Sequence, residues 1–160
     1  MERMSKIRLN TYFKEAKKHI ELIDESLEVL KPKTPIEDYD SLSQLERFAL
    51  NALIFRFSKL QDLIGAKIFR NYLDFSGFDV VEKSFFDILR EVEREGIVDI
   101  DSWSELRELR NRIAHDYLEE ADEVIESINL FIAQSSKLVD ILYRLEKRYY
   151  EIEQKRDRAY

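Results

Sequence analysis

Apolar positions recur every three to four residues in five blocks of the chain, and no block shows the sustained alternation of a half-buried strand. The first block has an apolar stripe made of Leu9, Tyr12, Phe13, Ala16, Ile20, Ile23, Leu27 and Leu30. It stops at Pro32 and Pro35, because proline cannot continue a helix. This block predicts a long amphipathic helix followed by a linker.

The second block predicts a long helix that begins at a capping box, Ser41–Gln44, and ends near Gly77. Its apolar positions are Leu45, Phe48, Ala49, Leu53, Leu60, Ile64 and Tyr72. An unbroken helix of this length would extend about 50 Å at 1.5 Å per residue. Gly65 is the expected place for a kink.

Three further helices are expected after Gly77. The third covers roughly Val80 to Glu95 and ends at Gly96. The fourth is predicted to begin at a second capping box, Ser102–Glu105, and to carry Leu106, Leu109, Ile113 and Tyr117 on its apolar face. The fifth covers about Glu120 to Glu153.

These blocks predict an all-α protein, an antiparallel up-and-down four-helix bundle with an additional shorter helix. The scarcity of glycine (3) and proline (2) agrees with this class, and 160 residues suit one domain. We expect a single helical domain over residues 1–153 and a charged C-terminal tail over 154–160, which frays or reaches a partner.

Charge and composition narrow the classes of function. A net charge of −7 argues against nonspecific coating of nucleic acid, because phosphate binding depends on Lys and Arg. Any RNA contact must therefore be local, and Arg107, Arg110 and Arg112 are the candidate cluster. The chain has no cysteine and no apolar run long enough to span a bilayer, so we expect a soluble, cytoplasmic protein without membrane contact.

The segment Arg110–Tyr117 concentrates chemistry that packing does not require, including His115, one of only two histidines. Histidine exchanges protons near neutral pH, and arginine offers phosphate a permanent cation. Residues five apart on a helix point about 140° away from each other, whereas Asn111 and His115 share a face. A second copy of the helix, related by a two-fold axis, would bring Arg110 and His115 to one cleft. We therefore expect a homodimer with a composite site.

The pattern Arg110-x4-His115-x-Tyr117, with Asn111 directly after the arginine, resembles the HEPN superfamily and more narrowly the HepT toxins. The resemblance implies the toxin of a type VII-like toxin–antitoxin module, a metal-independent endoribonuclease that acts on tRNA or mRNA as a homodimer. It also implies a minimal nucleotidyltransferase antitoxin that neutralises the toxin by adding AMP to a tyrosine. By this resemblance Arg110 and His115 are catalytic, Asn111 supports them and Tyr117 is modified, with no cofactor and no metal.

Alternatives stay open for each residue. Arg110 can be an ordinary surface arginine that pairs with Glu105 or Glu108. In the same structural interpretation, His115 interacts with the helix dipole and Tyr117 belongs to the core. The whole chain would then be a noncatalytic nucleotide- or substrate-binding subunit of a nucleotidyltransferase complex, or a structural adaptor. His19 lacks motif neighbours and is expected to be a packing or surface histidine, and the acidic run at Glu119, Glu120, Asp122 and Glu123 is expected to be solvated.

Overall fold

The part of the chain that the structure describes consists of helices joined by short turns. A computed structural model describes the backbone of residues 2–116 and 121–159 and the side chains of residues 3–113 and 124–159. The helices are α1 (Glu2–Leu30), α2 (Gln44–Leu63), α3 (Phe69–Ser76), α4 (Phe85–Arg94), α5 (Ile100–Asp116) and α6 (Ala121–Arg158). No β-strand occurs in these ranges, so the predicted all-α class is confirmed.

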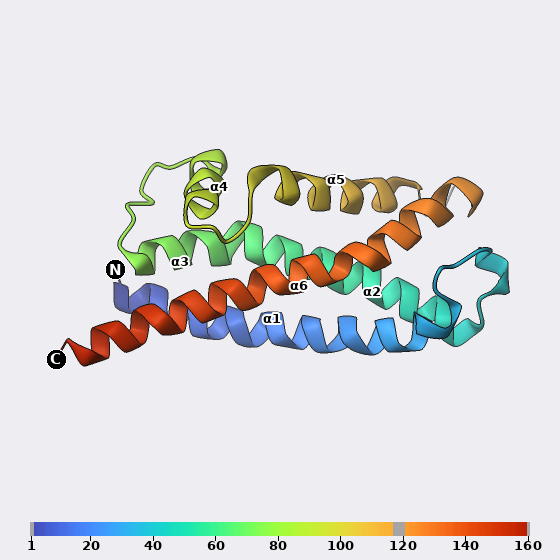
Figure 1. Cartoon of the computed structure of the whole chain (residues 1–160), viewed down its shortest axis with the longest axis horizontal. Coiled ribbons are helices and arrows are strands. Elements are labelled where there is room, and N and C mark those ends of the chain that lie inside the picture. Colours follow the sequence, from blue (N-terminus) through green and yellow to red (C-terminus); the bar gives the residue numbers. More distant parts are fainter. Residues whose placement is uncertain (1, 117–120, 160) are drawn as a thin grey trace.

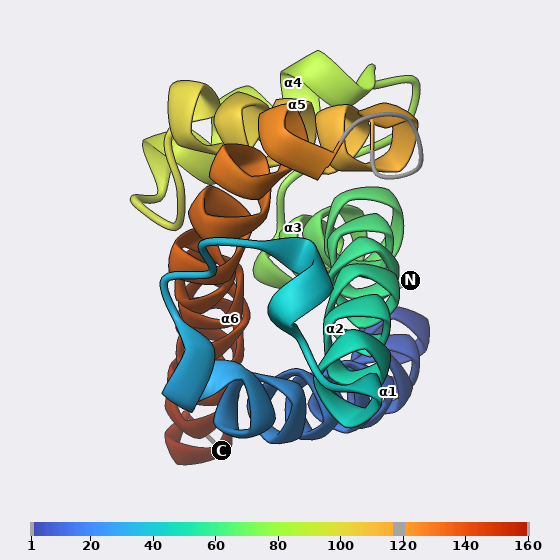
Figure 2. The same cartoon turned by 90° about the vertical axis from the view of Figure 1, so that its right-hand side faces the viewer.

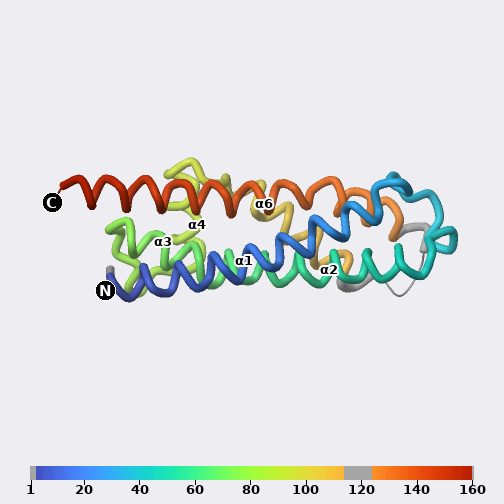
Figure 3. Tube along the Cα trace, turned by 90° about the horizontal axis from the view of Figure 1, so that it is seen from below, coloured from blue at the N-terminus to red at the C-terminus, as the bar shows by residue number. Residues whose placement is uncertain are grey.

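The long helices run alternately in opposite directions, and both ends of the chain lie at the same end of the molecule (Figure 1). Viewed along its length, the molecule has α1 below, α2 and α6 on opposite sides, and α5 with α4 above (Figure 2). Figure 3 shows α1 beside α2 along their length and α6 across from them. The helices share one core, whose largest fully buried side chains are Tyr72, Tyr149, Phe57, Phe69 and Phe131.

The start of α2 differs from the sequence expectation by two residues. Ser43 is the N-cap: its Oγ accepts a hydrogen bond from the Glu46 N–H at 3.1 Å, and Glu46 Oε1 accepts from the Ser43 N–H at 2.8 Å. The predicted box at Ser41 is wrong, because Ser41 closes a 3-10 turn and its hydroxyl donates to the Asp38 carbonyl at 2.6 Å. Both patterns fit the sequence rule, and only one satisfies the free N–H groups of this helix.

The expected kink at Gly65 is a π-helical turn, Ile64–Ile68, that joins α2 to α3. The Phe69 N–H donates to the Ile64 carbonyl, five residues earlier, so the helix widens here without ending. Gly65 is needed for close packing: a Cβ at this position would lie 2.9 Å from Cζ2 of Trp103. Gly77 ends α3 in the left-handed conformation, φ 101°, as predicted.

α4 and α5 begin at capping residues that the sequence expectation missed. α4 starts at Phe85, after the Ser84 cap, and the residues from Val80 form a turn instead of helix. α5 starts at Ile100, and the Asp99 carboxylate accepts from the N–H and hydroxyl of Ser102 at 2.7 and 2.9 Å. The predicted box at Ser102 is therefore wrong. An aspartate before the first turn also interacts favourably with the helix dipole.

α6 extends to Arg158, past the expected end of the fifth helix at Glu153. The first five residues of the predicted charged tail, 154–158, are thus helical. Arg156 docks this end on α3, because its guanidinium lies 4.5 Å from the centre of the Phe75 ring and donates to the Phe75 carbonyl at 2.6 Å. Among the described helices, none has an apolar stretch that could cross a bilayer.

Candidate functional site

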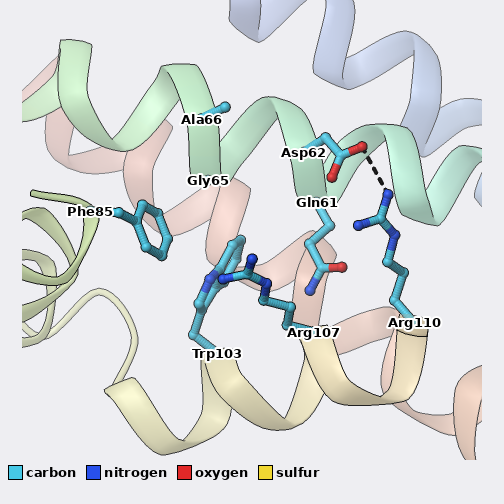
Figure 4. A pocket seen from close by; sticks show the side chains of 8 residues that line it. All are labelled: Gln61, Asp62, Gly65, Ala66, Phe85, Trp103, Arg107 and Arg110. Carbon is cyan, nitrogen blue, oxygen red and sulfur yellow. Dashed lines mark hydrogen bonds and ion pairs between the residues drawn. The ribbon is translucent and has the colours of Figure 1, made fainter. Parts of the chain in front are cut away.

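Arg110 lies in the second half of α5 and faces α2. Its Nη2 donates to Oδ2 of Asp62 at 3.1 Å, and the two side chains are 30% and 54% exposed (Figure 4). The partner is neither Glu105 nor Glu108, which the sequence suggested for a surface arginine. Arg110 therefore pairs with a residue of another helix instead of a carboxylate of α5 itself.

The other motif residues are described unequally. Asn111 is exposed on α5, and Ile113 is buried, at 1% exposure, which seats this half of the helix on the core. The backbone of His115 belongs to the last turn of α5, but its side chain lies outside the described side chains. Tyr117 lies outside the described residues altogether. The structure thus places Arg110, and the expected pairing of Arg110 with His115 stays a prediction.

A pocket of about 370 Å³ opens beside the Arg110–Asp62 pair, between α5 and the junction of α2 with the π-helical turn. It is lined by Gln61, Asp62, Gly65, Ala66, Phe85, Trp103, Arg107 and Arg110. Trp103, Arg107 and Arg110 share one face of α5, because they stand at i, i+4 and i+7. Phe85, at the start of α4, lies at the end of the pocket away from the ion pair (Figure 4).

The three arginines of the predicted cluster lie on two different faces of α5. Arg107 and Arg110 line this pocket, whereas Arg112 lines a separate surface hollow with Glu105 and Glu108. Two residues correspond to about 200° around a helix, which explains why Arg110 and Arg112 diverge. Arg107 is exposed and forms no ion pair with any residue whose side chain is described.

Gln61 is the residue of this site that sequence reasoning missed. Its side chain is buried, at 3% exposure, and neither Oε1 nor Nε2 has a hydrogen-bond partner among the described residues. Trp103 Nε1 is also buried without a partner there. Burying an unsatisfied polar group costs about 1–3 kcal/mol. The sequence did hold a signal for Gln61. This residue stands four positions after Phe57 and three positions before Ile64, and both of these side chains face the core.

An exposed apolar stripe on α2 leads toward the same site. Leu45, Phe48 and Phe55 are 65%, 59% and 52% exposed, and Asp62 follows them on the same side of the helix. The sequence expectation grouped Leu45 and Phe48 with the core-facing positions, and this is wrong. The core is filled from the other side of α2 by Leu50, Leu53 and other residues. α2 is therefore apolar on both sides.

His19 is a packing histidine, as expected. It is buried, at 8% exposure, and its Nδ1 lies 3.3 Å from Nη1 of Arg56. Because a guanidinium only donates, this Nδ1 accepts and the neutral ring carries its proton on Nε2, 3.8 Å from Glu15 Oε1. Burial, with the Arg56 charge as a second cause, lowers the pKa of His19 below its ordinary 6.5.

Among the described side chains, no group of three His, Asp or Glu is arranged to hold a metal ion. The acidic run lies outside this search: Glu119 and Glu120 are not described, and the side chains of Asp122 and Glu123 are not described either. Comparison of the chain with protein-family models, with curated proteins and with solved structures found no match.

Proposed function

We propose that this protein is an endoribonuclease that cleaves RNA without a metal ion and that it is the toxin component of a type VII-like toxin–antitoxin module. The observation that supports this most directly is the position of Arg110. It is the first residue of the Arg110-x4-His115-x-Tyr117 pattern, and its guanidinium is partly exposed beside an open pocket. A cation at such a place can receive a phosphodiester from solvent.

The reaction needs only proton transfer and a positive charge. In the proposed mechanism, neutral His115 removes the proton of a ribose 2′-hydroxyl, and the 2′-oxygen attacks the adjacent phosphorus. The bond from phosphorus to the 5′-oxygen breaks, and a protonated His115 gives its proton to that oxygen. The products are a 2′,3′-cyclic phosphate and a 5′-hydroxyl. Arg110 stabilises the charge of the pentavalent phosphorane.

A homodimer is part of the proposal. Arg110 and His115 are five residues apart on α5, so one helix separates them by about 140° of rotation. In a dimer, Arg110 of one protomer would act with His115 of its partner, and the two His115 copies would divide the base and acid roles. The exposed side chains of Leu45, Phe48 and Phe55 on one side of α2 support this, because a partner protein can cover such apolar surface.

Three further elements belong to the same proposal. The fold is an antiparallel four-helix up-and-down bundle of α1, α2 with α3, α5 and α6, with α4 as the additional shorter helix. Asn111, exposed one residue after Arg110, would support the catalytic groups. Tyr117 would be the hydroxyl that a nucleotidyltransferase antitoxin modifies with AMP.

One observation favours a second candidate function. Asp62 neutralises part of the charge of Arg110, and a paired guanidinium offers less positive charge to a phosphorane. The chain would then be a noncatalytic nucleotide- or substrate-binding subunit of a nucleotidyltransferase complex. The two functions differ in activity and not in the partner.

The deciding experiment incubates the purified protein with tRNA and mRNA in EDTA. We expect cleavage that leaves cyclic phosphate ends and that disappears in His115→Ala. Dimers mixed from one native and one His115→Ala protomer should lose most activity, and full activity would refute the shared acid and base roles. Intact-mass analysis after co-expression with a nucleotidyltransferase tests Tyr117, with Tyr117→Phe as the control. A folded protein that cuts no RNA would favour the binding subunit.

A further inference from the structure

We propose that the pocket between α2 and α5 binds one nucleotide, with its phosphate on Arg107 and Arg110 and its base against Phe85, next to Trp103 and the Gln61 amide. The inference rests on the proposed function in one respect: the bound unit would be the nucleotide beside the phosphodiester that Arg110 holds. The pocket volume, about 370 Å³, is in the range of small-ligand sites.

One end of the pocket suits a phosphate. Arg107 and Arg110 are one turn apart on the same face of α5, and both line the pocket. In Figure 4 the Arg107 guanidinium points toward the Trp103 side and away from Arg110, so Arg107 must turn before both can hold one phosphate. Arg107 has no carboxylate partner among the described side chains, and the partner of Arg110, Asp62, is more than half exposed. An exposed ion pair adds little stability, so a phosphate can replace Asp62 on Arg110 at small cost. Until a phosphate replaces Asp62 on Arg110, the negative charge of Asp62 repels an approaching anion.

The other end suits a base. Phe85 is 38% exposed and offers a ring face, whereas Trp103 is buried, at 3% exposure, and is held edge-on against Phe69 with ring centres 4.9 Å apart. Aromatic side chains bind nucleobases by stacking, whatever the base. Gly65 packs directly against Trp103, so the base would lie beside this contact and not between the two residues. Phe85 therefore supplies ring surface at one end and Arg110 a positive charge at the other, and Arg107 adds a second charge there once it turns away from the Trp103 side.

Gln61 supplies the observation that points to a ligand. Its amide is buried with neither its donor nor its acceptor satisfied by a described residue, and it lines the pocket between the aromatic and arginine ends. A glutamine amide matches the paired donor and acceptor on the edge of a base such as adenine. Arg107 lies beside this amide (Figure 4). Since no ion pair with a described side chain holds Arg107 there, it can turn toward a phosphate and uncover the amide.

The fluorescence of Trp103, the only tryptophan of the chain, reports binding directly. The probes are adenosine 5′-monophosphate, adenosine and inorganic phosphate, titrated into the full-length protein. We expect saturable quenching by the nucleotide and binding about tenfold weaker or worse for each of its two parts, because each lacks contacts at one end. A 2′-O-methyl oligoadenylate, which cannot be cleaved, tests whether the bound nucleotide belongs to an RNA strand or is free in solution. Tighter binding of the oligomer identifies an RNA strand as the ligand, and tighter binding of the monophosphate identifies a free nucleotide.

Matched variants locate the site. Arg107→Gln should weaken nucleotide binding about tenfold, whereas Arg112→Gln, the same change on another face of α5, should leave it within about twofold. Gln61→Leu should weaken binding by a similar factor without lowering the melting temperature, because it removes a buried amide that has no hydrogen-bond partner among the described residues. Absence of saturable quenching, or equal affinities of Arg107→Gln and Arg112→Gln, would overturn the inference.

The same variants separate this inference from the proposed function. Nucleotide binding without RNA cleavage would refute the nuclease and leave the pocket assignment standing. RNA cleavage with normal kcat and KM in Arg107→Gln and Gln61→Leu would refute the pocket and leave the nuclease standing. If the pocket recognises the substrate, these two variants should raise KM more than they lower kcat.

Discussion

Arg110 on α5 is held by Asp62 on α2, across 48 residues of sequence, with 3.1 Å between Nη2 and Oδ2. Both side chains are accessible to solvent, so the pair is expected to contribute no more than about 1 kcal/mol to folding. Its consequence is geometric: it holds the guanidinium over the space between the two helices and next to the pocket. The pair orients a cation more than it stabilises the fold.

Replacing Arg110 should therefore affect activity far more than stability. Arg110→Ala is expected to lower RNA cleavage about 10²–10³-fold, as for loss of one charge-stabilising donor in other enzymes. The free energy of unfolding should change by less than about 1 kcal/mol. Arg112→Ala is the control, since Arg112 is exposed on the same helix and faces another way. Equal cleavage by both variants would remove Arg110 from the mechanism.

The α2 stripe should control the oligomeric state. Phe48→Glu combined with Phe55→Glu places two charges on exposed positions and should convert the proposed dimer to a monomer without unfolding the protein. Light scattering coupled to size-exclusion chromatography measures the mass, and circular dichroism checks the fold. Tyr143→Glu on α6, at 46% exposure, is the matched control and should stay dimeric. A native protein that is monomeric at all concentrations would refute the composite site.

Gly65→Ala tests the close approach of α5 to the π-helical turn. The added Cβ would lie 2.9 Å from Cζ2 of Trp103, whose indole is buried and cannot move freely. Overpacking of this kind costs about 1–3 kcal/mol, against a gain of up to about 1 kcal/mol from helix propensity. We expect a net loss in the free energy of unfolding by denaturant titration. Ala66→Ser, at an exposed neighbouring position, should change stability little.

The cap of α2 offers a direct comparison of two serines. Ser43→Ala removes the acceptor for the Glu46 N–H and should lower the free energy of unfolding by about 1 kcal/mol. Ser41→Ala should cost less, because the Ser41 hydroxyl is exposed and contacts only the carbonyl of a short turn. Thermal unfolding of the two variants measures the difference. A larger loss for Ser41→Ala would place the cap at the residue that the sequence pattern suggested.

His19 makes stability depend on pH. Burial and Arg56 lower its pKa in the folded state below 6.5, so the unfolded chain binds a proton more readily in this range. The stability that neutral His19 contributes is fully present above about pH 6.5 and is lost as the pH falls toward the folded pKa. Unfolding free energies at pH 7.5 and pH 5.5 should differ less in His19→Gln than in the native protein. Identical pH dependence in both would show that His19 is not the group responsible.

Local patterns predicted the helices well and their first residues poorly. The five apolar blocks and the end of α3 at Gly77 follow from spacing and from one residue that tolerates positive φ. The starts of α2, α4 and α5 were missed, because more than one serine or aspartate near a helix start can act as its cap. The structure selects among them by which side chain reaches the free N–H groups.

Only part of the candidate site could be predicted from the sequence. The Arg110–Tyr117 segment could be identified from the sequence, because its pattern depends only on residue types and their spacing along the chain. Asp62 and Gln61 could not be assigned to it, since they are brought there by the packing of α2 against α5.

The sequence by itself determined the all-helical class, an irregularity of the helix near Gly65 and the position of the Arg110–Tyr117 segment, because helical periodicity and backbone preferences are local properties. Only the tertiary structure decided which side of α2 faces the core and that Asp62 is the partner of Arg110. It also decided that the Gln61 amide is buried without a hydrogen-bond partner among the described residues. Those outcomes depend on which distant helix covers each face. That is set by the packing of the whole core, and helical spacing alone does not contain it.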